Sequence, residues 1–512
     1  AGFREFNATK LQQDYLKNMG AKITSPVDVV ETAFIAEYGS GKPIIGILGE
    51  FDALPGLSQK AGLTVQDPLE PGAYGHACGH NLLGTAGVLA FAALMDTMKE
   101  ENLPGTLRFY ACPAEENLSG KSYMARAGVF NDLDCCLTYH PGNQDAVSGG
   151  SNNAYTLMEF YFKGIPAHAG GAPWLGRSAL DACELMNVGV NYLREHVIPE
   201  ARIHYAYQDV GGAAPNVVQD HAQLKYFIRA PKITQVKEIG ERVKDVARGA
   251  ALMTGTEVDI YFSAGMCDYV PNDVLSEILS EALVAVGGPK FDDADRELAK
   301  KFFDLYTPSE IEAALKRLSY NYENWEDYRT IPLVEEVGPY KKTSAYGFGS
   351  TDVGDASYAA PTAQMNVATY ANGTPGHSWN VTAQVNSSIT HKALVTVAEA
   401  LSLACILTIE RPEAVKAARE EYIKSTGGAA GYLRYIATRE RVEILPDDRP
   451  PTRKQEQLIA KLVKDFPDTK TLYEYASYQA KPTKAAASAF LTLALESNWD
   501  ALRQSEQYLK YI

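Results

Sequence analysis

The chain has 512 residues, which is too long for one compact hydrophobic core and predicts two or more domains. A hydrophobic share of 46% indicates an ordinary globular protein rather than a disordered one. The formal net charge of -15 argues against nucleic acid as a partner, because phosphate binding needs clustered lysine and arginine.

The seven cysteines stand at scattered positions, which favours free thiols in a reducing compartment over a disulfide framework. No apolar stretch looks long and uncharged enough to span a bilayer, and no signal peptide opens the chain. We therefore expect a cytoplasmic protein without a membrane partner.

Strands that alternate with helices open the chain, and this pattern implies a largely parallel sheet covered on both faces. A helix is expected over 9–20, and two strands joined by a Gly-Ser-Gly turn are expected over 32–50. The next elements in order are a helix over 82–99, a buried strand over 107–112, a helix over 121–128 and a buried strand over 135–139.

The rhythm changes between about 155 and 262, where strands and amphipathic helices predict an inserted α+β sandwich. The α/β pattern then resumes, with a strand over 365–370 and an apolar helix over 391–408. The predicted parts are an α/β catalytic domain over 1–153 and 265–431, with an insertion over about 291–340, an inserted domain over 154–264, and a helical extension over 432–512.

Cys78 and His80 form the most informative motif, a thiol and an imidazole two residues apart before an apolar helix. The paired acids Glu115 and Glu116, then His140 and His377, each follow a predicted strand, and so does Asp52. Ligands of open α/β sheets bind beyond the carboxyl ends of the strands, so we expect these side chains to converge.

Cysteine, histidine and one carboxylate suit zinc or another first-row divalent metal. One acid of the Glu115–Glu116 pair can then bind the metal while its neighbour takes a proton from water. Asp52 can orient a ligand imidazole from behind. The pattern therefore predicts a metal-dependent hydrolase.

Each of these residues also has an ordinary structural explanation. Cys78 can be a small buried hydrophobe, His80 a helix cap, and Glu115–Glu116 a solvated turn. Two other functions also stay open. Cys78 can act as a nucleophile activated by a histidine, or the chain can be a non-catalytic binding protein that has kept the fold.

Six runs of residues carry a resemblance to a known family. The runs 49–56, 75–81, 113–116 and 164–170 together resemble the M20 metallopeptidase/amidohydrolase family, in its aminoacylase-like branch. The runs 173–182 and 350–355 resemble the group of aminobenzoyl-glutamate hydrolase and β-alanyl-lysine dipeptidase. The resemblance implies a zinc-peptidase-like catalytic domain with a mostly parallel sheet and an inserted ferredoxin-like dimerisation or lid domain.

The resemblance also implies two divalent metal ions, with Cys78 as the ligand that bridges them. The ions are then Zn2+, Mn2+ or Co2+. It implies Glu115 as general base and His168 as the donor that stabilises the oxyanion, in dimers often from the partner subunit. Asn216 and Arg229 match positions that grip a substrate carboxylate, although Arg229 can equally form a surface ion pair. The implied metal ligands are Cys78, His80, Glu116, His140 and His377.

The activity implied by the resemblance is hydrolysis of an amide bond by an activated water. The substrate is then an N-acyl amino acid, with aminobenzoyl-glutamate as the example, or alternatively a β-alanyl dipeptide. The enzyme is expected to form a homodimer or a higher homo-oligomer through the inserted domain. Asp352 and Asp355 either support the site, orient His377 or make ordinary turns.

Overall fold

The structure is a computed structural model, and it describes residues 2–117, 119–347 and 349–428. The larger sheet has seven strands in the order β1-β2-β4-β3-β5-β13-β6. Its strands are β1 Lys22–Thr24, β2 Phe34–Ser40, β3 Ile44–Glu50, β4 Gly105–Cys112, β5 Cys135–Gly142, β6 Ala146–Val147 and β13 Thr362–Ala368.

The four neighbouring strands β4, β3, β5 and β13 run parallel, whereas β1, β2 and β6 pair antiparallel. The continuous apolar sequence of β3 is buried along almost its whole length, as expected for a central parallel strand. The prediction of a mostly parallel sheet is therefore confirmed.

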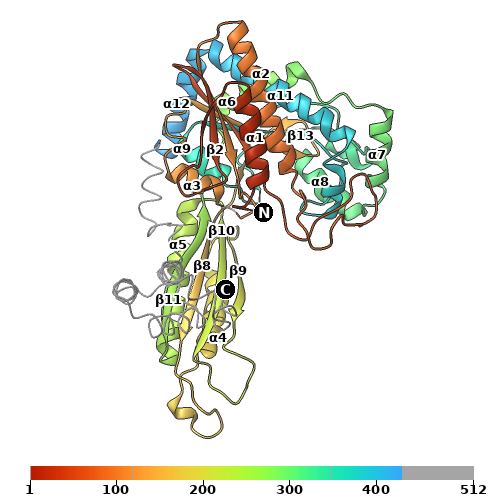
Figure 1. Ribbon diagram of the computed structural model, residues 1–512. Helices are drawn as coiled ribbons and strands as arrows, with labels where there is room; N and C mark the ends of the chain where they lie inside the picture. Colours follow the sequence, from red (N-terminus) through yellow and green to blue (C-terminus); the bar gives the residue numbers. More distant parts are fainter. Residues whose placement is uncertain (1, 118, 348, 429–512) are drawn as a thin grey trace, which may run out of the picture. The chain divides into compact units, whose positions relative to one another are not determined.

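Helices α2 (His80–Glu100) and α11 (Ser388–Glu410) lie side by side against the parallel strands (Figure 1). Contrary to our expectation, both are long and apolar enough to cross a membrane by length and composition alone. Their apolar windows are 67% and 50% buried, and core helices meet the same criteria, so this is weak evidence for a span. The remaining helices around the sheet are α1 Phe6–Asn18, α3 Gly120–Arg126, α6 Asp273–Val286, α9 Val353–Ala359, α10 Trp379–Gln384 and α12 Pro412–Thr426.

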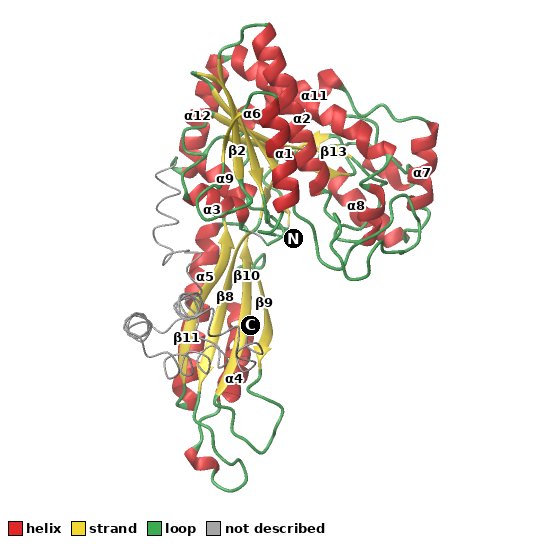
Figure 2. Cartoon of the chain, in the orientation of Figure 1, coloured by secondary structure: helices red, strands yellow, loops and turns green. Residues whose placement is uncertain are grey.

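A second sheet forms the inserted domain, with four antiparallel strands in the order β11-β8-β10-β9. Helices α4 and α5 pack side by side on it (Figure 2). Residues alternate between buried and half-buried along β10, which shows that one face is covered. This arrangement is ferredoxin-like. Its elements are β8 Ala154–Lys163, α4 Ala179–Leu193, β9 Arg202–Asp209, β10 His221–Ala230, α5 Ile233–Thr254 and β11 Glu257–Met266.

The segment 291–340 contains short helices of its own: α7 Asp293–Phe303, α8 Pro308–Leu318 and the 3-10 helix Trp325–Arg329. Capping boxes start both α-helices, and Pro308 occupies the first turn of α8. Phe302 and Tyr306 pack in one cluster with Ala371, Ala383 and Ile389. The insertion thereby supports the chain on both sides of His377. The predicted extension over 432–512 lies outside the described residues.

Several element predictions need correction. The strand β5 continues to Gly142 because it pairs with β13 as far as Ala368, so His140 lies within a strand and not beyond it. The strand β9 was not predicted, because it lies at the sheet edge and only Ile203 is buried. Helix α9 was also missed, because all seven of its residues are buried and show no amphipathic period.

Candidate metal centre

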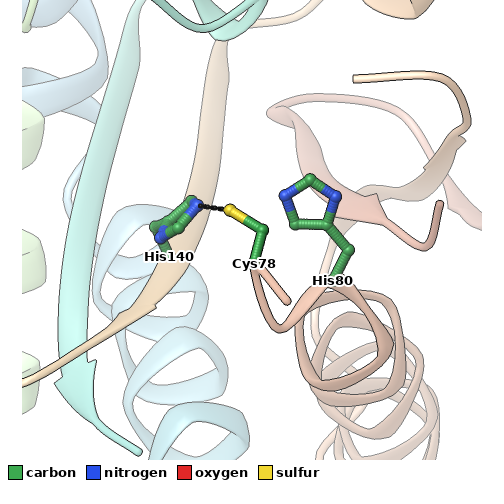
Figure 3. A group of neighbouring side chains, drawn as sticks. All are labelled: Cys78, His80 and His140. Atoms are coloured by element: carbon green, nitrogen blue, oxygen red, sulfur yellow. Dashed lines mark hydrogen bonds between the residues drawn. The ribbon is translucent and has the colours of Figure 1, made fainter. Parts of the chain in front are cut away.

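Cys78 lies between two histidine rings at the start of α2. Its Sγ is 3.4 Å from Nε2 of His140, and Figure 3 shows the imidazole of His80 on its other side. Gly79 takes the left-handed conformation with φ of 80°, which turns the chain into the helix. A Cβ at this position would meet Pro141 at 3.0 Å, so glycine permits the close approach of the helix to β5.

His80 is fully buried, and its Nδ1 lies 2.9 Å from Oδ1 of Asp52. Since a carboxylate can only accept, Nδ1–H donates, which leaves Nε2 as the nitrogen that could bind a metal. Burial alone would lower the pKa of His80, but Cys78, Glu50 and Asp52 raise it well above its usual range, so a metal ion at Nε2 would replace a proton there. The other oxygen of Asp52 accepts the backbone N–H of Glu116 at 2.8 Å. Asp52 therefore orients the ring of His80 and also fixes the loop that carries Glu115 and Glu116.

His140 has a fixed tautomer as well. Its Nδ1 lies 2.8 Å from the carbonyl oxygen of Pro141, so Nδ1–H donates and Nε2 faces Cys78 as an acceptor. Burial lowers the pKa of His140 to about 4, which keeps the ring neutral at pH 7. A neutral imidazole with a free Nε2 is the form that ligates metal ions.

The paired acids and His377 are held by unusual backbone conformations. Ala114, just before Glu115, has φ of 58°, and its N–H donates to Glu5 at 3.1 Å. His377 has φ of 53° and donates its N–H to Ala77 at 3.0 Å. Positive φ at residues other than glycine is rare and gathers at functional sites. Nε2 of His377 consequently lies 3.5 Å from Oε2 of Glu116.

The five predicted ligands come together in two groups that share Cys78. One group is Cys78, His80 and His140, and the other is Cys78, Glu116 and His377. Within each group the potential ligand atoms lie within 4.8 Å of one another. Two adjoining groups of ligands could hold a pair of divalent ions, as the two-metal sites of hydrolases do.

The charges of the site fit cations. Glu50, Asp52, Glu115 and Asp352 are all buried, with one buried lysine, Lys121, among them. Burial and the neighbouring Glu50 carboxylate raise the pKa of Glu115 well above its usual range. Oε1 of Glu116, Oε2 of Glu50 and Nε2 of His80 are buried and have no hydrogen-bond partner among the described residues. Divalent cations would satisfy these atoms and balance the negative charge.

Two residues that the sequence analysis did not single out belong to this site. Glu50 ends β3, and its Oε1 forms an ion pair of 2.5 Å with Nζ of Lys121. Lys121 also pairs with Asp352, whose Oδ2 accepts the Lys121 backbone N–H at 2.7 Å. The alternation of a strand, which places residues 50 and 52 on one face, was the available signal for Glu50. Nothing in the local sequence marks Lys121 as buried.

The other predicted residues lie in the inserted domain and in none of the metal-ligand groups found in the described part of the chain. His168 is exposed, and its Nδ1 accepts the N–H groups of Gly170 and Gly171 at 3.1 and 2.9 Å. Its proton is therefore on Nε2. Asn216 is the neighbour of His168, since its carbonyl oxygen accepts the N–H of Ala169 at 3.0 Å.

Arg229 lies at the far end of β10, with its guanidinium 4.4 Å above the ring of Phe227. Burial lowers its pKa from the usual range. His168 and Asn216 lie beyond the start of the same strand. β10 has ten residues, and such a strand measures about 30 Å. The structure therefore separates Arg229 from His168 and Asn216 within one protomer.

The fold and the site define a metal-dependent hydrolase of the α/β class, and the family model for peptidase family M20/M25/M40 matches residues 46–406. The chain belongs to this family, and it is an amidohydrolase. A second family model, for MobL relaxases, matches residues 418–497, most of which lie outside the described residues.

The chain is 42% identical to a subunit of p-aminobenzoyl-glutamate hydrolase of Escherichia coli (strain K12) over 408 residues, 78% of this chain and 84% of that protein. It is 32% identical to the Xaa-Arg dipeptidase of Mus musculus over 262 residues, 49% and 56% of the two chains. The crystal structure of a dinuclear metal-binding peptidase of the M20 family from Bacillus subtilis has the same fold. Its TM-score is 0.50 at 19% identity, over 80% of this chain and 93% of that chain.

Proposed function

We propose that this protein uses two divalent metal ions to hydrolyse the amide bond of an N-acyl amino acid, with aminobenzoyl-glutamate as its leading substrate. The observation that carries the metal centre is the pair of ligand groups that share Cys78. The substrate proposal is supported by the 42% identity to the p-aminobenzoyl-glutamate hydrolase of Escherichia coli.

The residues that would hold the ions are Cys78, which is common to both ligand groups, and His80, Glu116, His140 and His377. When bound, the ions supply Lewis acidity to the amide carbonyl and to the attacking water. Glu115 accepts a proton from that water and passes it to the leaving nitrogen. Its Oε2 lies 3.8 Å from Nε2 of His80. Glu115 is in the loop after β4, whereas His80 is the first residue of α2.

We further propose that the active enzyme is a homodimer in which His168 and Asn216 come from the partner protomer. His168 carries a proton on Nε2 and can donate it to the oxyanion of the intermediate. Arg229 suits the carboxylate of the released amino acid, because a guanidinium can bind it with two hydrogen bonds. Within one protomer the length of β10 separates Arg229 from His168 and Asn216. This separation supports an active site built from residues of two protomers. We expect sedimentation to show a dimer, and a monomer with full activity would contradict the proposal.

A test of the substrate compares kcat/KM for aminobenzoyl-glutamate with that for β-alanyl-lysine, an Xaa-Arg dipeptide and N-acetyl amino acids. We expect aminobenzoyl-glutamate to be preferred. The dipeptidase alternative is supported by the shorter match to the Xaa-Arg dipeptidase, and faster turnover of a dipeptide would establish it. Measuring activity with Zn2+, Mn2+ and Co2+ added in turn identifies the metal that the site prefers.

A cysteine-nucleophile hydrolase is the second candidate, since Cys78 and His140 lie within 3.4 Å. Burial raises the pKa of Cys78 to about 12, however, whereas a nucleophilic cysteine needs a lowered pKa. Chelation decides between the two, because a thiol enzyme survives it and the proposed metal enzyme does not. We also propose a cytoplasmic location, which the seven unpaired cysteines support.

A further inference from the structure

The two carboxylate oxygens of Glu50 differ in their partners: one forms an ion pair, and the other has no hydrogen bond among the described residues. The side chain is 2% exposed at the end of β3. Its Oε1 is held by Lys121, whereas Oε2 has no hydrogen-bond partner among the described residues. Oε2 points to the metal centre, 3.2 Å from Nε2 of His80. A buried carboxylate oxygen without a partner is costly and needs an explanation.

His80 cannot satisfy this oxygen while it binds a metal. Nδ1–H of His80 donates its hydrogen bond to Asp52, and an Nε2 that binds a metal carries no proton. Two acceptor atoms then face each other at 3.2 Å, an arrangement that is stable when both contact the same cation. Glu50, His80 and Glu115 accordingly form a third group whose potential ligand atoms lie within 4.8 Å of one another.

Lys121 and Asp352 fix the direction of Glu50. Both side chains are fully buried, and Lys121 forms ion pairs with Glu50 and with Asp352. Asp352 also accepts the backbone N–H of Lys121, which fixes the start of α3. Because Lys121 holds Oε1, the carboxylate of Glu50 cannot rotate away, and Oε2 stays aimed at the centre. Buried groups that orient a ligand in this way are a usual part of metal sites.

We propose that Glu50 is a further ligand of the metal ion bound by His80, and that Lys121 and Asp352 are its positioning residues. The inference deepens the proposed function and rests on it, since it requires that the centre binds metal. It assigns Lys121 the task of balancing the charge that an additional carboxylate brings into the centre.

The test measures metal bound per subunit and its dissociation constant by chelator competition, in the wild-type chain, in Glu50→Gln and in the double variant Glu50→Gln/Lys121→Met. In Glu50→Gln, Lys121 keeps its ion pair with Asp352. The double variant removes the carboxylate together with its counter-ion, and Asp352 keeps the backbone N–H of residue 121 as its hydrogen-bond donor. We expect the wild type to bind two ions per subunit. In both variants the dissociation constant of one of the two ions should rise on the order of tenfold or more. With Co2+ as the probe, the visible absorption should shift in both variants.

The control variant is Glu37→Gln, which removes the ion pair between Glu37 on β2 and Arg108 on β4. Its metal binding should equal that of the wild type. Circular dichroism checks that each variant folds. If Glu50 is only the counter-ion of Lys121, the double variant binds two ions as tightly as the wild type, and this inference is overturned. A wild-type chain that binds no metal would instead overturn the proposed function.

Discussion

At the level of single residues, the centre depends on which nitrogen of each histidine carries a proton. Asp52 accepts a hydrogen bond from Nδ1–H of His80, and the Pro141 carbonyl oxygen accepts one from Nδ1–H of His140. Both rings therefore present Nε2 to the space around Cys78. His168 has the other tautomer: its Nδ1 accepts hydrogen bonds from two backbone N–H groups, so the proton is on Nε2. The first two rings suit a cation, and the third suits an anion.

Glu115→Gln should lower kcat roughly a hundred- to ten-thousand-fold, because it removes the proposed base and keeps the shape of the side chain. Metal content should stay that of the wild type, since Glu116 and not Glu115 is the proposed ligand. Kinetics and elemental analysis of the same preparation check both points. Glu100→Gln, at the exposed end of α2, is the matched control. Substantial residual activity in Glu115→Gln would refute the assignment of the base.

At the level of helices and strands, the four parallel strands bring the site together. Glu50 ends β3, the paired acids follow β4, His140 lies near the end of β5, and His377 follows β13. The carboxyl ends of these strands lie along one edge, which is where ligands of such sheets bind. The insertion acts on the same region through α7, which contacts the start of α11 near Ser388.

Asp295 in α7 provides a pH-dependent prediction for this contact. It is fully buried and accepts from Lys392 at 2.5 Å and from Ser388. Burial alone would raise its pKa, but these hydrogen bonds outweigh burial and lower the pKa. Asp295 therefore contributes its full stabilisation of the fold above the pKa of an aspartate in the unfolded chain, about 3.9. This contribution is lost as the pH falls through the lower pKa of Asp295 in the folded protein.

Asp295→Asn should accordingly reduce the free energy of unfolding at pH 7 by roughly 2 kcal/mol. The difference in Tm between this variant and the wild type should shrink below about pH 4. Thermal unfolding from pH 7 to pH 3 measures it. A Tm difference that stays constant over that range would contradict this account of Asp295.

For the molecule as a whole, metal binding is expected to be part of its stability. The centre gathers acids from distant parts of the chain, and Lys121 is the lysine buried among them. Without cations, burial of Glu50, Asp52, Glu115 and Asp352 together is unfavourable. Metal ions would therefore connect the first half of the catalytic domain to the segment that carries His377.

Removal of the metal should therefore lower the Tm of the full-length protein. At a metal concentration a hundred times the dissociation constant, binding stabilises the folded state by about 2.7 kcal/mol per ion. Calorimetry before and after dialysis against a chelator, followed by readdition of Zn2+ or Mn2+, measures the effect. An unchanged Tm in the metal-free protein would show that the centre contributes nothing to stability.

The family, the parallel sheet and the kinds of side chain that meet in the centre could all be predicted from the amino-acid sequence. They follow from local signals: alternating elements, apolar runs, and motifs such as Cys78-Gly79-His80. The three-dimensional structure was needed to show that the ligand groups share Cys78, that Lys121 is buried against Glu50 and Asp352, and that β9 completes the second sheet. These features depend on residues far apart in the chain, such as 121 and 352, whose neighbours in sequence carry no sign of the partner they will meet.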